Sequence, residues 1–219
     1  MVDVSRGKFI TFDGLDGSGL TEQVEMLREW LRRSGCDMHR VAFTAEPSQG
    51  PAGTEIRHAL QGRLNIGEEA LALLFAADRA DHLDRFILPR LKAGIHVICD
   101  RYYLSFLAYQ SQLLPDGWDW LWQLNARNWQ PDLTIFLQSP PGVCIERIRQ
   151  KFEPERYERP EILRGVSMQF NRIIPLLRDE RKEDIRIVDS SGSMESTHQS
   201  ILKLVASLIL PSSEELTKE

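Results

Sequence analysis

The stretch that decides the fold is DGLDGSGLTE, residues 13–22. Gly14, Gly19 and Thr21 have the spacing of a phosphate-binding loop, in which glycines let successive backbone N–H groups curl around one anion. Such a loop normally carries a lysine before its hydroxyl residue, whereas this chain has Leu20. The motif therefore predicts a phosphate-binding turn, and the alternative is a glycine-rich turn that binds no ligand.

The segments around this turn predict the fold class. A buried strand is expected before it at 8–13, and a helix after it at 22–33. Further strands are expected at 39–44, 95–99, 133–137 and 185–188, and further helices at 54–61, 67–93, 104–113, 117–129, 141–150, 161–181 and 195–209. Strands that alternate with helices predict an α/β fold with a parallel sheet. We expect one domain over residues 1–210, a charged insert around 150–160, and a loose tail at 211–219.

The composition narrows the class of partner. A net charge of −5 disfavours nucleic-acid binding, because proteins that coat a phosphate backbone are usually basic. No apolar run approaches the ~20 residues that cross a bilayer, so no membrane partner is expected. Cys36, Cys99 and Cys144 are scattered and form no CxxC pair, which predicts reduced, buried thiols and a cytoplasmic protein. Small nucleotides, which need only a local cationic pocket, fit this composition.

Two further segments carry residues suited to a nucleotide. Asp100 and Arg101 follow the apolar run IHVIC, at the strand end where ligands sit in open α/β folds. The carboxylate could hold a hydrated Mg²⁺ and the guanidinium could bridge phosphates; a structural ion pair is the alternative. Phe75 and Arg79 share a helical face, where an aromatic ring could stack on a base while the arginine reaches its edge. The alternative is a core phenylalanine and a solvated arginine.

Taken together, these segments resemble the thymidylate kinase family. The resemblance runs from about residue 8 to 189 and includes FxxFDGLDGSG, TxEP, GTEIR, LLFAADRADH, ICDRY, SxxAYQ, PDLTIFL and PP(x)₄ERI, in the family's order and spacing. It implies a three-layer P-loop NTPase-type fold with a five-stranded parallel sheet flanked by helices. It also implies transfer of the ATP γ-phosphate to dTMP with Mg²⁺, usually by a homodimer.

The resemblance assigns roles to individual residues. ATP phosphates would be bound by Gly14, Asp16, Gly17, Ser18, Gly19, Leu20 and Thr21, and Mg²⁺ by Thr21 and Asp100. The nucleoside monophosphate would contact Asp16, Arg57, Phe75, Arg79, Arg101, Ser105, Tyr109 and Gln110. The lid cations would be Arg149, Lys151, Arg156 and Arg159, and the catalytic residues Asp16, Arg101 and Arg156.

Four positions depart from the family pattern. Leu20 replaces the loop lysine, Ala45 an arginine that reaches the acceptor phosphate, Phe106 a serine of the base pocket, and Gln138 an aspartate after the fourth strand. We expect Leu20 to place an apolar group where phosphate oxygens would lie. Loss of one preorganised cation typically costs ~10²–10³ in rate. Three hypotheses follow: a dTMP kinase aided by lid cations, an impaired nucleotide-binding protein, or a kinase with another acceptor.

Overall fold

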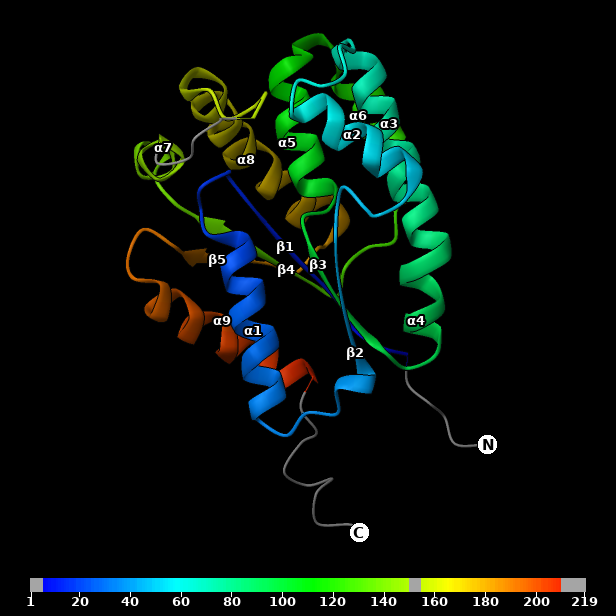
Figure 1. Cartoon of the computed structure of the whole chain (residues 1–219), viewed down its shortest axis with the longest axis vertical. Coiled ribbons are helices and arrows are strands. Elements are labelled where there is room, and N and C mark those ends of the chain that lie inside the picture. The colour runs from blue at the N-terminus through cyan, green and yellow to red at the C-terminus, as the bar shows by residue number, and fades with distance from the viewer. Residues whose placement is uncertain (1–5, 150–154, 210–219) are drawn as a thin grey trace.

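The glycine turn joins strand β1 (Phe9–Gly14) to helix α1 (Leu20–Arg33) in the computed structural model, which describes residues 6–149 and 155–209 (Figure 1). The sheet also contains β2 (Val41–Ala45), β3 (His96–Asp100), β4 (Leu133–Gln138) and β5 (Ile185–Asp189), in the order β2-β3-β1-β4-β5. Every neighbouring pair is parallel. The expected α/β class and its five parallel strands are confirmed.

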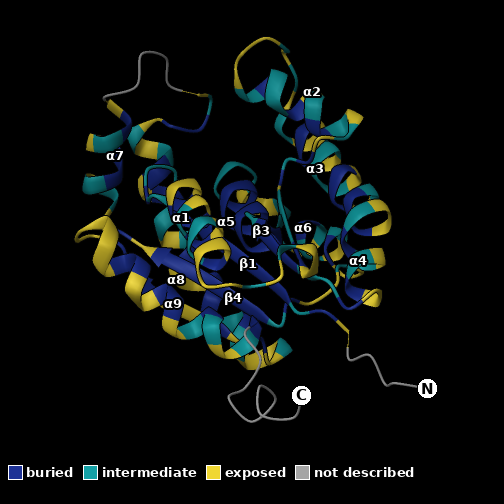
Figure 2. Ribbon diagram, turned by 60° about the horizontal axis from the view of Figure 1, so that its bottom comes forward, coloured by how far each residue is buried: buried dark blue, intermediate teal, exposed yellow. Residues whose placement is uncertain are grey.

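Helices cover both faces of the sheet, because its central strands carry apolar side chains on both sides. On one face Ile10 and Phe12 of β1 pack with α1 and with α9 (Met194–Ile209). On the other face Phe9 packs in a larger cluster that includes residues of α2 (Pro51–Leu60), α5 (Tyr103–Leu113) and α8 (Pro160–Arg181). Figure 2 shows the strands as the buried centre of the molecule.

The long helix expected at 67–93 is present, but it is interrupted. It consists of α3 (Glu68–His82), a π-helical turn η2 (Leu83–Ile87) and α4 (Leu88–Lys92). Pro89 lies in the first turn of α4. Because proline has no N–H to donate to the preceding turn, the hydrogen-bond pattern changes there. The remaining helical elements are η1 (Met38–Arg40), η3 (Pro115–Gly117), α6 (Trp118–Leu124) and α7 (Pro141–Arg149).

Two sequence-based expectations are wrong in detail. The helix expected at 117–129 ends at Leu124. Asn125 stops it, because its side chain turns inward and its Nδ2 donates to the Leu121 carbonyl at 2.7 Å. The expectation of buried thiols holds for Cys99 and Cys144, whereas Cys36 is only partly buried. All three cysteines are free.

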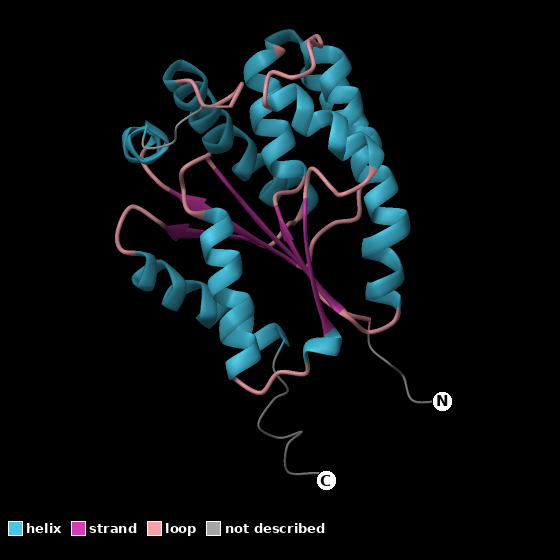
Figure 3. Ribbon diagram, in the orientation of Figure 1, coloured by secondary structure: helices cyan, strands magenta, loops and turns pink. Residues whose placement is uncertain are grey.

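The parallel strands bring the ligand-binding candidates to one edge of the sheet. The loops that leave the strands at their carboxyl ends lie along this edge (Figure 3). Gly14 ends β1, Ala45 ends β2 and Asp100 ends β3, so three motifs that are distant in sequence become neighbours. None of the helices within residues 6–149 and 155–209 is long and apolar enough to span a bilayer.

Candidate functional site

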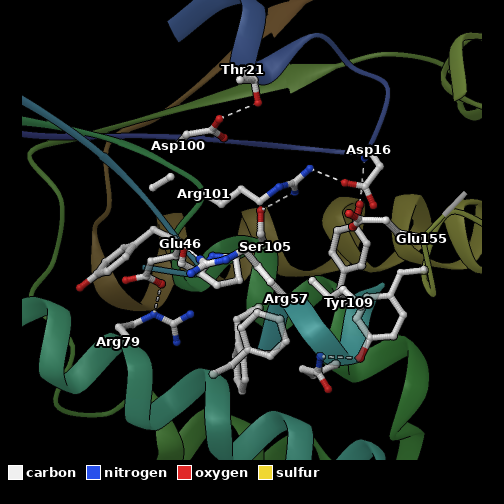
Figure 4. A pocket seen from close by; sticks show the side chains of 18 of the residues that line it. Asp16, Thr21, Glu46, Arg57, Arg79, Asp100, Arg101, Ser105, Tyr109 and Glu155 are labelled. Carbon is white, nitrogen blue, oxygen red and sulfur yellow. Dashed lines mark hydrogen bonds and ion pairs between the residues drawn. The ribbon is translucent and has the colours of Figure 1, made fainter. Parts of the chain in front are cut away.

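A cavity of about 380 Å³ opens at this edge of the sheet, next to the glycine turn (Figure 4). Its volume lies in the range of ordinary small-molecule sites. It is lined by Asp16, Thr21, Ala45, Glu46, Pro47, Gln49, Arg57, Leu60, Gln61, Phe75, Arg79, Asp100, Arg101, Tyr102, Ser105, Phe106, Tyr109, Gln110, Glu155 and Tyr157. All the residues predicted to bind the monophosphate therefore line a single cavity.

The glycine turn has the backbone that its sequence predicts. Gly17 and Gly19 have φ values of 80° and 89°, which other residues adopt only with strain. A Cβ atom on Gly17 would lie 2.6 Å from the Cys144 carbonyl oxygen, so α7 leaves no room for a side chain. Gly19 is the N-cap of α1, and among the described residues no side chain caps that helix. Its first N–H groups are therefore available to an anion.

The side chain of Leu20 does not enter the cavity, contrary to the sequence-based expectation. Only 4% of Leu20 is exposed, and it packs in the cluster that contains Phe12 and Val24. Of the turn's residues, only Asp16 and Thr21 line the cavity. The leucine therefore removes a cation from the loop without blocking the space beside it.

Thr21 and Asp100 form the part of the site that suits a magnesium ion. The Thr21 hydroxyl donates to Asp100 Oδ2 at 2.8 Å, and both residues line the cavity. Burial raises the pKa of Asp100, although Arg101 and the Thr21 hydroxyl oppose that shift. Mg²⁺ keeps most of its waters and needs only one or two protein oxygens, so this pair fits a hydrated ion beside a phosphate.

Arg101 occupies a strained backbone position between the turn and the cavity. Its φ of 68° is uncommon for a residue other than glycine. The buried carboxylate of Asp13 stabilises this conformation, because its Oδ1 accepts from the backbone N–H of Tyr102 at 3.2 Å and of Ser105 at 2.9 Å. The Ser105 hydroxyl also donates to Asp13 Oδ1, at 2.5 Å. Burial raises the pKa of Asp13 to about 6.

The Arg101 side chain contacts the turn itself. Its Nη2 donates to Asp16 Oδ1 at 2.6 Å (Figure 4). Its Nη1 donates to the Gly14 carbonyl at 2.9 Å. Burial would lower the pKa of Arg101, but nearby carboxylates, above all Asp16, outweigh that effect and raise it. Arg101 is therefore a permanent positive charge between the glycine turn and the predicted acceptor pocket.

Arg79 is held by buried partners on one wall of the cavity. Its Nε donates to Glu46 Oε2 at 2.8 Å and its Nη1 to Asn125 Oδ1 at 2.9 Å. Only 2% of its side chain is exposed, so it is not a solvated surface charge. The Phe106 ring lies 5.0 Å from its guanidinium carbon and 6.2 Å, edge to face, from the Phe75 ring. Phe106 thus adds an aromatic surface to this wall.

The opposite wall is built around Tyr109 and Gln110. The Tyr109 hydroxyl accepts from the backbone N–H of Asp16 at 2.9 Å, which links the helix to the turn. Gln110 Nε2 donates to the Tyr157 hydroxyl at 3.4 Å, whereas its buried Oε1 has no hydrogen-bond partner among the described residues. A buried acceptor without a partner at a cavity wall is a feature that a bound ligand would satisfy.

Arg57 also lines the cavity and is held by its neighbours. Its Nη1 donates to the Ser48 carbonyl at 2.6 Å and to the Pro47 carbonyl at 3.1 Å, while Nη2 reaches the Thr54 hydroxyl at 3.3 Å. These contacts orient the guanidinium without neutralising it, because all three partners are uncharged.

Arg156, which is predicted to be a lid cation, pairs with residues outside the cavity in this structure. Its Nη2 donates to Glu68 Oε1 at 2.7 Å and to the Ile66 carbonyl at 3.0 Å, and it does not line the cavity. The Tyr157 hydroxyl donates to the other oxygen of Glu68 at 2.8 Å. Arg156 and Tyr157 of the predicted lid therefore contact Glu68 at the start of α3.

Two of the other predicted lid cations, Arg149 and Arg159, are exposed and do not line the cavity. Arg149 is exposed and pairs with Glu146 at 3.4 Å on α7, which fits a solvated helix charge. Arg159 is exposed at the start of α8. Lys151 lies outside the described residues.

Sequence reasoning missed three residues of the site. Glu46 belongs to the TxEP motif but was given no role, and a buried acid next to a buried arginine could have been suspected from that motif alone. Tyr157 lies within the charged insert, where no pattern distinguishes it from a solvated residue. Asn125 belongs to none of the motifs, and its contact with Arg79 joins residues that are 46 positions apart.

Comparison with known proteins gives a single result. The Thymidylate kinase family model matches residues 12–201. A probable thymidylate kinase of Pyrococcus horikoshii is 38% identical over 214 residues, covering 91% of this chain and 96% of the relative. The thymidylate kinase of Desulfotalea psychrophila is 35% identical over 206 residues, covering 93% and 96%. A solved thymidylate kinase from Candida albicans is 26% identical with a TM-score of 0.75, covering 92% of each chain.

Proposed function

The chain belongs to the thymidylate kinase family, and from that premise we propose how its residues perform the reaction. The reaction transfers the γ-phosphate of ATP, with Mg²⁺, to dTMP and gives dTDP. One observation carries the assignment of the site: Asp16, Arg79, Arg101 and Gln110 converge on one cavity that starts at the glycine turn.

The ATP phosphates bind to the backbone of the glycine turn. The residues involved are Gly14, Asp16, Gly17, Ser18, Gly19, Leu20 and Thr21. The uncapped start of α1 supports this role, because unpaired N–H groups and the helix dipole both attract an anion. Leu20 contributes only its backbone, since its side chain is buried in the core.

Thr21 and Asp100 would hold the magnesium ion, because their oxygens lie side by side at the cavity. Mg²⁺ supplies charge that offsets the negative charge of the phosphates in the transition state. Before the ion binds, the hydrogen bond between these two residues keeps the threonine oxygen beside the carboxylate. The pair is therefore already assembled in the structure.

The acceptor dTMP occupies the cavity, with its base against Phe75 and its phosphate towards the turn. Arg79 contacts the base edge, and Tyr109, Gln110 and Ser105 border the base and sugar. The Ser105 hydroxyl is already used by Asp13, so this serine acts chiefly through that contact. Arg57 and Arg101 contact the acceptor phosphate from two sides, and Asp16 approaches the sugar hydroxyl.

Arg101 is the principal catalytic cation in this proposal. Phosphoryl transfer depends on positioning and on charge placed where negative charge develops, and Arg101 lies between donor and acceptor positions. An incoming phosphate would compete with Asp16 for its Nη2, which frees the Asp16 carboxylate for the sugar. Arg156 adds a second cation only when it exchanges Glu68 for a phosphate.

The oligomeric state, the location and the rate of this protein are proposed from the family resemblance. A cytoplasmic homodimer that binds neither nucleic acid nor membranes stays a prediction; sedimentation and light scattering would test the dimer. A lowered rate is also a prediction, because Leu20 and Ala45 both lack the cation that the family pattern has at these positions.

The test is a coupled ADP-release assay with ATP, Mg²⁺ and a panel of nucleoside monophosphates. We expect turnover with dTMP above that with dCMP, and a loss of ~10²-fold or more in Arg101→Ala. Arg33→Ala is the matched control, because Arg33 lies exposed at the far end of α1. Background turnover with every acceptor would contradict the kinase assignment, and a preference for another acceptor would contradict dTMP. Calorimetry would then separate nucleotide binding from catalysis.

A further inference from the structure

Asn125 is a fully buried amide whose orientation is fixed by its contacts. Its Oδ1 accepts from Arg79 Nη1 at 2.9 Å and from Asn128 Nδ2 at 2.6 Å. Its Nδ2 donates to the Leu121 carbonyl at 2.7 Å. A flipped amide would turn its N–H groups towards the Arg79 donor and its oxygen towards the Leu121 carbonyl, so only one orientation satisfies both contacts.

The Arg79 guanidinium is held at two of its three nitrogens. Glu46 accepts from Nε and Asn125 accepts from Nη1, whereas Nη2 has no hydrogen-bond partner among the described residues. Two bonds in the plane of the guanidinium prevent rotation about its terminal bonds. The N–H groups of Nη2 are thereby left for a ligand in the cavity, which Arg79 lines together with Phe75 and Phe106.

Glu46 is itself oriented by a second buried residue. His82 Nδ1 lies 3.3 Å from Glu46 Oε1, and its Nε2 lies 2.7 Å from the Thr44 hydroxyl. A hydrogen-bonded chain therefore runs from Thr44 of β2 to Asn125 after α6, and of its members Glu46 and Arg79 line the cavity. Asn125 closes this chain and does not itself line the cavity.

We propose that Asn125 is a positioning residue for base recognition: with Glu46 it fixes Arg79 so that Nη2 presents only donors to the base edge. The proposal rests on the proposed function, in which the base lies against Phe75 and Arg79. A fixed donor pair accepts a carbonyl oxygen and rejects an amino group, because an amino group would leave both partners unpaired. Without Asn125 the guanidinium can turn, and the discrimination between thymine and cytosine falls.

The test compares Asn125→Leu, which keeps the branching at Cγ but removes the polar atoms, with the control Asn128→Ala, which removes a contact to Asn125 but none to Arg79. Hydrogen bonds to charged groups contribute enough for a ~10–100-fold loss of kcat/KM for dTMP in Asn125→Leu. We expect the loss mainly in the KM for dTMP, with the KM for ATP unchanged and a lower dTMP-to-dCMP preference. The control should stay within about threefold of the unmodified protein, since a neutral hydrogen bond contributes less.

An unchanged KM and an unchanged dTMP-to-dCMP preference in Asn125→Leu would overturn the proposal. So would an equal loss for all acceptors, which a purely structural role would produce. If Asn125→Leu does not fold, Asn125→Ser serves instead, and ¹⁵N NMR of arginine side chains gives a readout on the unmodified protein. We expect separate, slowly exchanging Nη signals for Arg79, assigned with Arg79→Lys; a freely rotating guanidinium would refute the proposal.

The two hypotheses fail in different ways. Absence of dTMP binding and turnover in the unmodified protein would reject the proposed function. Normal activity of the unmodified protein together with normal selectivity of Asn125→Leu would reject only the role of Asn125.

Discussion

Replacing Leu20 by lysine tests how this turn works without its usual cation. The leucine side chain lies in the core with Phe12 and Val24, and only 4% of it is exposed. A lysine at this position must withdraw its ammonium from that core. Its stem can remain against the apolar neighbours while the charged end turns towards the cavity, as long cationic side chains commonly do.

Two opposing magnitudes follow from this geometry. Full burial of a leucine is worth about 1.5–3 kcal/mol, and a lysine stem keeps part of it, so we expect a loss of about 1–2 kcal/mol in the free energy of unfolding. A preorganised cation at the transferring phosphate is worth ~10²–10³ in rate, so we expect kcat to rise by up to ~10²-fold. The variant should therefore be less stable and more active than the natural sequence.

The assay combines urea unfolding, followed by tryptophan fluorescence, with coupled ADP release at saturating dTMP and ATP. Leu20→Met is the matched control, because it keeps an apolar side chain of similar size and should lose less than about 1.5 kcal/mol with no gain in rate. Equal stability of Leu20→Lys and the natural protein would refute the buried placement of residue 20. An unchanged kcat would refute the idea that the missing ammonium limits the reaction.

Three further predictions concern substitutions that change the charge in or near the cavity. Because burial raises the pKa of Asp13 to about 6, the folded protein keeps a proton that the unfolded chain releases near pH 4, so stability should fall by up to about 3 kcal/mol between these pH values. Asp13→Asn should abolish this fall in urea titrations across pH 4–7, and a parallel pH dependence in both proteins would contradict the assignment. Glu68→Gln removes the charge that holds Arg156 and should raise kcat severalfold. An unchanged kcat would contradict a catalytic role for Arg156. Ala45 is exposed and lines the cavity, so Ala45→Arg should lower the KM for dTMP about tenfold through an added charge-assisted contact, and an unaltered KM would show that no phosphate lies near it.

The fold could be predicted from the sequence because its signals are local. Each strand is a short apolar run between helical patterns, and IHVIC alone indicates a central parallel strand. The position of Asp100 beside the turn followed from the same reasoning, since parallel strands end at one edge of the sheet. The helix expected at 117–129 ended early because Asn125 serves a distant arginine, and no local pattern reports that contact.

The parts of the site that could not be predicted depend on partners far apart in the chain. Arg156 and Glu68 are 88 positions apart, and both are charged residue types that are usually solvated at the surface. The left-handed backbone of Arg101 is stabilised by the buried carboxylate of Asp13, which accepts from the backbone that follows Arg101. A sequence motif does not report such a contact. Sequence spacing therefore predicted which residues meet, but it left open which of them are already bound to one another.

Position 20 shows that the direction of a side chain can matter more than its place in a motif. Counted within the phosphate loop, Leu20 is a missing lysine. Counted along α1, it lies four residues before Val24 and seven before Leu27, which is the spacing of one helical face. The same sequence supports both interpretations, and helix geometry decides between them. Because Leu20 lies on the same helical face as Val24 and Leu27, its side chain points towards the sheet. The leucine thus adds to the packing of α1 beneath the turn, whereas in the proposed mechanism Arg101 and the magnesium ion neutralise the phosphate charge.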